Sequence, residues 1–225
     1  MGAIVGLHAR PIPMLDIALR YELETPMEFE STTPAAKQKN LAPQDKWGGK
    51  PLESFADGAK EERPIPAVLG AGVAVHLAKG ITISASYHYY FTEQADKADD
   101  HKAIVGGYTK GYDDDYKNGF DLGVSLEYQL SPKLLVSVGY IRAVTGGNSE
   151  TYSDFEYALD SHSVGGGLRY GLNDNLQLTL GLSRTFFEEA KNEPGAPNMG
   201  FLVAASDETF NKRVYDIALG AQYRF

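Results

Sequence analysis

The chain of 225 residues contains no cysteine. This absence excludes a disulfide framework, a thiol nucleophile and a thiolate metal site. Positive charge is also scarce, because 21 lysines and arginines stand against 30 aspartates and glutamates, and the net charge is −9. No basic patch or stripe interrupts this acidic composition. Nucleic acid is therefore excluded as a partner.

Long hydrophobic runs are absent as well. No segment approaches the roughly 18 apolar residues that a transmembrane helix needs, which excludes a helical membrane protein. The first residues, MGAIVGLHARP, lack the charged and apolar regions of a secretion signal. A membrane β-barrel is compatible with this composition, because its strands alternate between apolar and polar residues. The 24 glycines and 14 tyrosines fit strands and tight turns better than helices.

Alternation with a period of two is what the sequence does contain. In the last twelve residues, VYDIALGAQYRF, one face is apolar, with an aromatic residue at each end of an aliphatic band. Such a segment is typical of a β-strand whose two faces meet different environments. The same pattern predicts about nine strands, near residues 3–9, 15–23, 66–77, 81–91, 120–130, 133–142, 161–172, 176–183 and 214–225.

The connections between these segments alternate in length. Every second one is tight, namely ARPIPM, LAKG, LSPK and GLND, and the others are long and polar, near 24–64, 92–118, 143–159 and 188–212. Short turns on one rim and long loops on the other are typical of outer-membrane barrels. A soluble lipocalin-like barrel would be polar outside, whereas here the apolar face is broad and the other face is rich in Gly, Ser and Ala. We predict an all-β fold, an antiparallel transmembrane β-barrel in the bacterial outer membrane.

Several stretches resemble a known family. IPAVLGAGVAVHLAKGITISASYHYYF, LGVSLEYQLSPKLLVSVGYIRA and SHSVGGGLRYGLNDNLQLTLGLSRTFF resemble the C-terminal part of FadL-type outer-membrane long-chain fatty-acid transporters. AIVGLHARPIPMLDIALRYELETPMEFE resembles a strand pair nearer the middle of that family. The resemblance implies a 14-stranded barrel, plugged by an N-terminal hatch domain, that takes up hydrophobic molecules passively. It also implies that 1–225 is a single barrel domain, the C-terminal portion, without the hatch and early strands.

The number of strands leaves two alternatives. Nine strands close only by pairing two parallel neighbours, and an unclosed edge in lipid is not viable. Either five preceding strands are missing from this chain, or segment 3–9 is not a wall strand and the remaining eight close. We expect the first alternative, because HARPIPMLD has the pattern of an ordinary hairpin.

The last strand resembles the final strand of outer-membrane barrels in general. Those strands end on an aromatic residue, with a glycine and another aromatic residue upstream. Gly220, Tyr223 and Phe225 match that pattern. The resemblance implies that they form a signal for the barrel-insertion machinery, and that outer-membrane lipid surrounds the strand.

Candidate ligand-binding residues fall into two groups. Arg20, His88 and Tyr90 are expected to face the lumen, where a cation and a hydroxyl group could hold a fatty-acid carboxylate. Arg20 lies two residues from Glu22 on the same face, so a structural ion pair is the alternative that we favour for it. The other group lies in the loops: Trp47 and Phe55 within 24–64, and Phe155 and Tyr157 before the strand at 161–172.

The apolar loop residues can be interpreted in two ways. Those of loop 24–64 could form a hydrophobic groove that captures a ligand at the outer surface. Alternatively, they could pack that loop onto its own barrel rim, and the pattern does not separate these interpretations. Phe155 and Tyr157 reverse the parity of the strand that follows, so either they point into the upper lumen or a bulge intervenes.

Catalytic and metal sites are not indicated. The run Asp160, Ser161, His162 and Ser163 is contiguous, whereas catalytic triads combine separated positions, and His162 is expected on the lipid face. Three adjacent aspartates at 113–115 lack the spacing of a calcium-binding EF-hand loop. We expect no enzyme activity and no cofactor.

The sequence thus supports two hypotheses of different classes. The first is passive outer-membrane transport of hydrophobic small molecules, with long-chain fatty acids as the expected ligands. The second is a small closed barrel that acts as a structural or adhesive surface module. In the second, charged residues of the inner face would pair with one another and fill the lumen.

Overall fold

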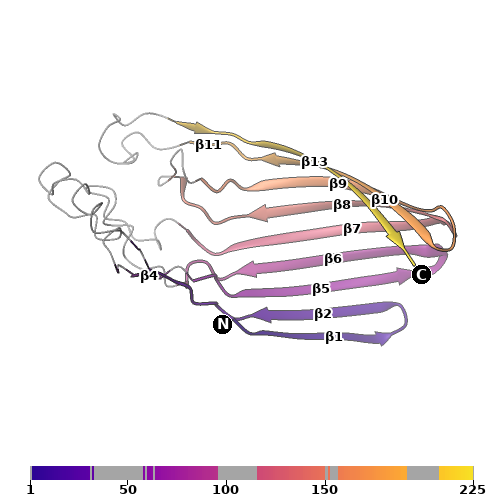
Figure 1. The fold of residues 1–225 in the computed structure, drawn as a ribbon, viewed down its shortest axis with the longest axis horizontal. Coiled ribbons are helices and arrows are strands. Elements are labelled where there is room, and N and C mark those ends of the chain that lie inside the picture. The colour runs from indigo at the N-terminus through magenta and orange to yellow at the C-terminus, as the bar shows by residue number, and fades with distance from the viewer. Residues whose placement is uncertain are drawn as a thin grey trace, which may run out of the picture.

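The computed structural model describes residues 2–30, 32, 58, 60–62, 64–95, 116–149, 152, 157–191 and 208–224. Its main element is an antiparallel sheet of nine strands (Figure 1). These strands are β1 (Ile4–Ile12), β2 (Leu15–Glu22), β5 (Val68–Leu77), β6 (Ile81–Tyr90), β7 (Gly119–Ser131), β8 (Leu134–Val144), β9 (Ser161–Gly171), β10 (Leu176–Phe187) and β13 (Arg213–Tyr223). All nine predicted strands are confirmed.

The strands follow one another around the sheet in chain order, each paired with its sequence neighbour among the nine. The pairing places the apolar residues on one face and the small and polar residues on the other, because residues directly opposite each other point to the same face. On β10 and β13, for example, Leu180 lies opposite Leu219, while Gly181 lies opposite Ala218. The predicted alternation is therefore continuous across the sheet, with one apolar face and one face of small and polar residues.

The connections also follow the prediction. Four tight turns join β1 to β2, β5 to β6, β7 to β8 and β9 to β10, at the same end of the sheet (Figure 1). The β5–β6 turn contains the 3₁₀ segment η3 (Ala78–Gly80), in which Lys79 has a φ of 70°. Gly80 also has a positive φ, 73°, a conformation that glycine adopts without steric cost.

The long connections contain short elements that the sequence did not predict. A two-stranded ribbon pairs β3 (Glu28–Glu30) with β4 (Lys60–Glu62), and a second pairs β11 (Ala190–Lys191) with β12 (Thr209–Phe210). In the first ribbon, Lys60 forms an ion pair with Glu28 at 2.7 Å. Strands of two or three residues are too short to show a periodic pattern, so sequence reasoning could not find them.

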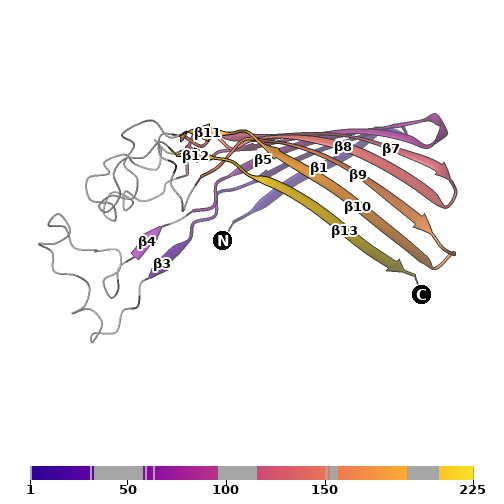
Figure 2. The ribbon, with the colours of Figure 1, turned by 90° about the horizontal axis from the view of Figure 1, so that it is seen from above.

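The sheet bends into an arch with β1 and β13 at its two edges (Figure 2). Within the described residues, β1 pairs only with β2, and β13 pairs only with β10. Segment 3–9 therefore forms a wall strand, paired with β2 from Ile4 to Ile12. The alternative in which this segment lies outside the wall and eight strands close on themselves is wrong, because β2 is paired on both sides.

The distribution of apolar side chains is inverted relative to that of a water-soluble domain. In the described residues, the buried hydrophobic side chains are only Ala67, Ala95, Tyr152, Leu159 and Phe210. In contrast, the apolar face of the sheet is exposed along its whole width, with Leu219 at 82% and Ile217 at 74% exposure. An apolar surface this large requires an apolar environment to cover it.

No helix in the described part of the chain has the length and apolar character needed to cross a membrane.

Candidate functional site

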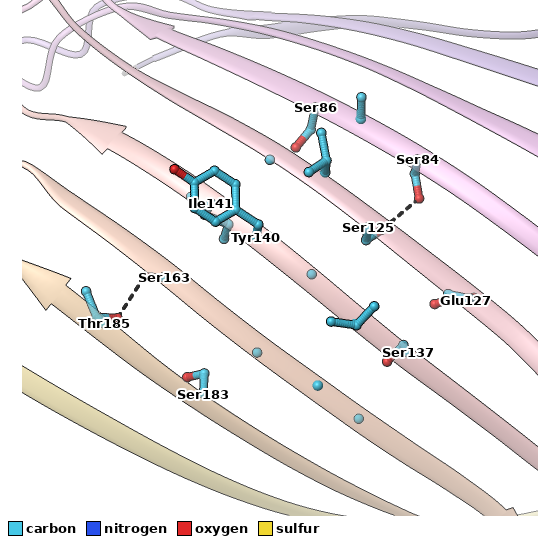
Figure 3. A pocket seen from close by; sticks show the side chains of 18 of the residues that line it. Ser84, Ser86, Ser125, Glu127, Ser137, Tyr140, Ile141, Ser163, Ser183 and Thr185 are labelled. Atoms are coloured by element: carbon cyan, nitrogen blue, oxygen red, sulfur yellow. Dashed lines mark hydrogen bonds between the residues drawn. The ribbon is translucent and has the colours of Figure 1, made fainter.

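Small side chains cover the middle of the inner face, opposite the apolar face. They come from β6 to β10 and β13 and surround a hollow of about 680 Å³ (Figure 3). Its inward-pointing residues include Ser84, Ser86, Gly123, Ser125, Ser137, Gly139, Ser163, Gly165, Gly167, Ser183 and Thr185. A hollow of this volume is within the range of pockets that hold small molecules.

Hydrogen bonds between neighbouring strands engage several of the hydroxyl groups in this hollow. Ser84 and Ser125 lie 2.9 Å apart, and Ser163 and Thr185 lie 2.7 Å apart (Figure 3). Ser183 donates to Asp216 at 3.0 Å. These polar groups are therefore satisfied within the wall, and the small side chains leave space in front of it.

Charged and aromatic residues lie on the inner face toward the long loops. Arg20 and His88 share one row across β2, β5 and β6, with Gly70 between them. A Cβ atom at Gly70 would lie 3.0 Å from the His88 ring, so the glycine leaves room for that ring. Tyr90 lies one row further out. The structure therefore brings Arg20, His88 and Tyr90 into one band of the inner face.

The polar groups of this band are already engaged. Arg20 pairs with Glu22 at 2.8 Å, which confirms the ion pair that we favoured from the sequence. Tyr90 donates its hydroxyl hydrogen to Asp121 at 2.7 Å. Because Glu22 already holds Arg20, that guanidinium group is not free for a ligand carboxylate.

A second polar cluster occupies the inner face at the end with the tight turns. Arg10 donates two hydrogen bonds of 2.7 Å to Asp16, and His76 contacts the same carboxylate at 2.7 Å. His8 lies 3.2 Å from it, and Thr82 lies 3.1 Å from His76. These contacts connect β1, β2, β5 and β6 at the end of the sheet that carries the tight turns.

A small apolar core lies among the connections at the opposite end. Tyr152, Leu159 and Phe210 are buried against one another, and Phe187 packs against them. Tyr157 stacks on Phe210 with ring centroids 5.1 Å apart and remains 39% exposed. We call these five residues the rim cluster.

Hydrogen bonds fix the chain around the rim cluster. The Tyr152 hydroxyl donates to the carbonyl oxygen of Ala158, and Thr145 donates to both Ala158 and Asp160. Burial, together with the nearby Asp160 carboxylate, raises the pKa of the Tyr152 hydroxyl above its ordinary value. The hydroxyl is therefore neutral at physiological pH, as its buried position requires.

The sequence identified only part of the rim cluster. Tyr157 was a candidate, whereas Tyr152 and Phe210 were not, because each is a single aromatic residue within a long polar connection. The residues Trp47, Phe55 and Phe155 lie outside the described part of the chain. The ligand-binding role of all these residues stays a prediction.

In the last strand, Gly220 faces inward opposite Thr179, and Tyr223 faces outward opposite Leu176. Phe225 lies outside the described residues. Their role as an insertion signal stays a prediction. His162 points to the apolar face, as expected, where it contacts Tyr140 and Glu188. In the described residues, no group of three or more acidic or histidine side chains is arranged to hold a metal ion.

Aromatic residues border the apolar face at both ends. Tyr128, Tyr170 and Tyr223 lie near the tight turns, and Tyr21, Phe120, Phe186 and Tyr215 lie near the long connections. Phe120 and Tyr128 are eight residues apart on β7, as are Tyr215 and Tyr223 on β13. Eight residues span roughly 26 Å along a strand, or about 20 Å of height at a tilt near 40°. Two aromatic girdles around an aliphatic band are the pattern of a barrel wall in a bilayer.

Solved structures share the fold of this sheet. A FadL homologue from Pseudomonas aeruginosa superposes with a TM-score of 0.64 and 14% sequence identity, over 99% of this chain and 52% of that one. The chain therefore shares the fold of about half of that structure. The deltaS2S3 mutant of TodX, a monoaromatic hydrocarbon channel, superposes with a TM-score of 0.55 and 14% identity, over 84% of this chain and 45% of that one.

These two structures are about twice as long as the chain, which spans roughly half of each. Both are outer-membrane barrels, so the fold of this chain is that of an outer-membrane β-barrel, as the sequence predicted. No model of a known protein family matches the chain. A comparison with curated proteins also finds no match.

Proposed function

We propose that residues 1–225 form one side of an outer-membrane channel through which hydrophobic small molecules pass passively. The observation that carries this proposal is the hollow of about 680 Å³ along the inner face, where small side chains leave space in front of the wall. The rim cluster supports it, because Tyr157 presents a half-exposed ring at the end where a ligand would enter from outside. In this proposal the chain is the later part of a longer barrel.

The finer proposal is that the ligands are long-chain fatty acids. One similar structure is named as a FadL homologue, and the other is named as a channel for monoaromatic hydrocarbons. Near the long connections, the inner face favours ligands that need no cation, because Arg20 is held by Glu22. Fatty acids and neutral hydrocarbons should therefore differ little in their binding to this wall, since both depend on their apolar parts.

The channel catalyses nothing in this proposal. In the hollow, the hydroxyl groups of Ser84 and Ser125 pair with each other, as do those of Ser163 and Thr185. Thr82 lies against His76, which contacts Asp16, but Arg10 also holds this carboxylate and the cluster does not line the hollow. The alternative, a small closed structural barrel, requires strands β2 to β13 to close on themselves. Strand β2 is instead occupied by β1.

The test is uptake by vesicles that contain the native protein, with radiolabelled oleate and toluene as separate probes. Gly139 faces the hollow, and a Cβ atom there would make ordinary contacts, 3.5 Å from the Val124 carbonyl oxygen and 3.7 Å from the Ser125 Cβ. The variant Gly139→Phe therefore places a ring in the hollow without strain in the wall. Val138→Phe adds a similar ring on the outward face, where Val138 is half-exposed, and serves as the matched control.

We expect Gly139→Phe to slow the uptake of both probes while Val138→Phe leaves uptake unchanged. Equal uptake by the native protein and Gly139→Phe would contradict a path along this wall. Uptake of toluene but not oleate by the native protein would retain the channel and reject fatty acids as its ligands. Uptake of neither probe above that of empty vesicles would reject the transport proposal itself.

A further inference from the structure

The apolar face carries one charged region, at the outer ends of β8, β9, β10 and β13. One row across these strands consists of Arg142, His162, Phe186 and Arg213, paired in that order. The adjacent row, one step toward the middle of the sheet, contains Arg184 between Val164 and Tyr215. These four strands lie side by side in Figure 1. Charged groups on a surface that faces lipid are costly, so each needs a partner.

Arg142 has its partners within the chain. Its guanidinium group lies 2.7 Å from Glu188 and 3.2 Å from Asp160. It also donates to the Ser161 carbonyl oxygen at 3.3 Å. Two carboxylates therefore balance this arginine, and the part of the region near β8 and β9 carries no excess positive charge.

Arg184 has no such balance in the described part of the chain. Its guanidinium carbon lies 4.2 Å from the centre of the Phe186 ring and 5.0 Å from the centre of the Tyr215 ring. Its Nε atom is buried and has no hydrogen-bond partner. The rings hold the cation through their negative faces, but no described carboxylate neutralises it.

Arg213 adds a second cation beside Arg184. It lies opposite Phe186 on β13, one row from the Arg184–Tyr215 pair, and its side chain is exposed. No ion pair within the described residues involves it. Diagonal neighbours on one sheet face have Cβ atoms about 7 Å apart, so two guanidinium groups at such positions can bind one doubly charged anion.

The position of this pair identifies the anion. Phe186 and Tyr215 belong to the aromatic girdle near the long connections, the level at which aromatic residues meet lipid headgroups. Arginine binds phosphate through paired hydrogen bonds, and lipid headgroups present phosphate at this depth. We propose that Arg184 and Arg213 form a binding site on the outward face for the phosphate of an outer-leaflet lipid, with Phe186 and Tyr215 packed beside the headgroup.

This site is separate from the proposed channel. Arg184 and Arg213 lie on the face opposite the hollow, so a lipid bound there does not obstruct the inner wall. The assignment depends on the fold and on the aromatic girdle, and it does not depend on which molecule passes through the lumen.

The test measures lipid retention by the native protein in detergent, with native mass spectrometry as the readout. The probes are lipid A with two phosphates, the same lipid after dephosphorylation, and inorganic phosphate alone. The variants are Arg184→Gln and Arg213→Gln, and the matched control is Arg169→Gln, which removes the same charge from the inner face of β9. Detergent gel electrophoresis without heating confirms that each variant is folded, because the folded barrel does not unfold in the detergent of the gel.

We expect the native protein and Arg169→Gln to retain phosphorylated lipid A, and each of the other variants to bind it about tenfold more weakly, as loss of one charge-assisted hydrogen bond predicts. Dephosphorylated lipid should bind as weakly to the native protein as phosphorylated lipid binds to the variants. Equal retention by all variants would overturn the site, as would equal retention of both lipids. Displacement of the lipid by millimolar inorganic phosphate would show an anion site without lipid specificity and would also overturn the proposal.

Discussion

Leu219 and Ala218 are neighbours on β13, yet they meet opposite surroundings. Leu219 lies halfway between Tyr215 and Tyr223 on the outward face and is 82% exposed. Ala218 faces inward, opposite Gly181. The outward face is broad and aliphatic, and the inward face is small and polar. The sheet is stable only where each face meets its own solvent, so the comparison shows that the fold depends on lipid on one side and water on the other.

The largest expected effect comes from placing a charge on each face in turn. Leu219→Arg puts a guanidinium group at the middle of the apolar band and should destabilise the folded barrel by about 2–4 kcal/mol. Ala218→Arg places the same group beside water and near Asp216, and should change stability by less than about 1 kcal/mol. Urea unfolding of the native protein refolded into lipid vesicles measures both. Similar losses for the two variants would contradict the assignment of the faces.

A smaller effect on stability is expected at the rim cluster. Its apolar side chains are buried against one another, whereas those of the adjoining sheet face outward. The raised pKa of Tyr152 means that the folded state holds the phenolic proton more tightly than the unfolded state. The stabilisation is therefore complete below the unfolded pKa near 10 and is lost as pH rises above that value. Tyr152→Phe should remove this pH dependence and cost about 1 kcal/mol for the lost hydrogen bond to Ala158.

The measurement for the rim cluster is ultraviolet titration of tyrosine between pH 9 and 12, with the difference between native protein and Tyr152→Phe reporting the single group. A midpoint for Tyr152 at or below that of an exposed tyrosine would contradict its burial in a packed cluster.

The smallest effect on stability is expected on the inner face. Glu22→Gln removes the partner of Arg20, and because the pair is largely solvated its loss should change stability by less than about 1 kcal/mol. The variant also frees a cation on the inner face, in the band near the long connections. Laurate should therefore bind Glu22→Gln more tightly than the native protein, whereas dodecanol should bind both equally.

Titration calorimetry with laurate and dodecanol separates the contribution of the Arg20 charge from that of the apolar chain of the ligand. Arg20→Gln is the matched control, because it removes the cation itself and should bind both probes like the native protein. A native protein that already prefers laurate strongly over dodecanol, and loses that preference in Arg20→Gln, would show that Glu22 does not hold Arg20 away from ligands.

The fold was almost entirely predictable from the sequence, because alternation is a local property. Each strand carries its own pattern, and the residues of β7 from Phe120 to Leu130 indicate both faces without reference to any neighbour. The tight turns were predictable for the same reason. The ribbons β3–β4 and β11–β12 were not, since two or three residues contain no period.

The site was predictable only as a set of inward-facing residues. The parity of each strand placed Arg20, His88 and Tyr90 on one face, but register decided that they lie in one band. Similarly, Arg184 and Arg213 are 29 positions apart in the chain, and only the pairing of β10 with β13 brings them together.

The sequence by itself determined which side chains face lipid and which face the lumen, because successive side chains of a strand point to opposite faces of the sheet. Only the tertiary structure decided which of those side chains meet. Strand β2 is joined to β5, and β10 to β13, by long connections whose length does not fix the register, so hydrogen bonding between the strands sets these rows. The ion pair of Arg20, the hollow in front of Gly139 and the isolated cation of Arg184 are properties of those rows.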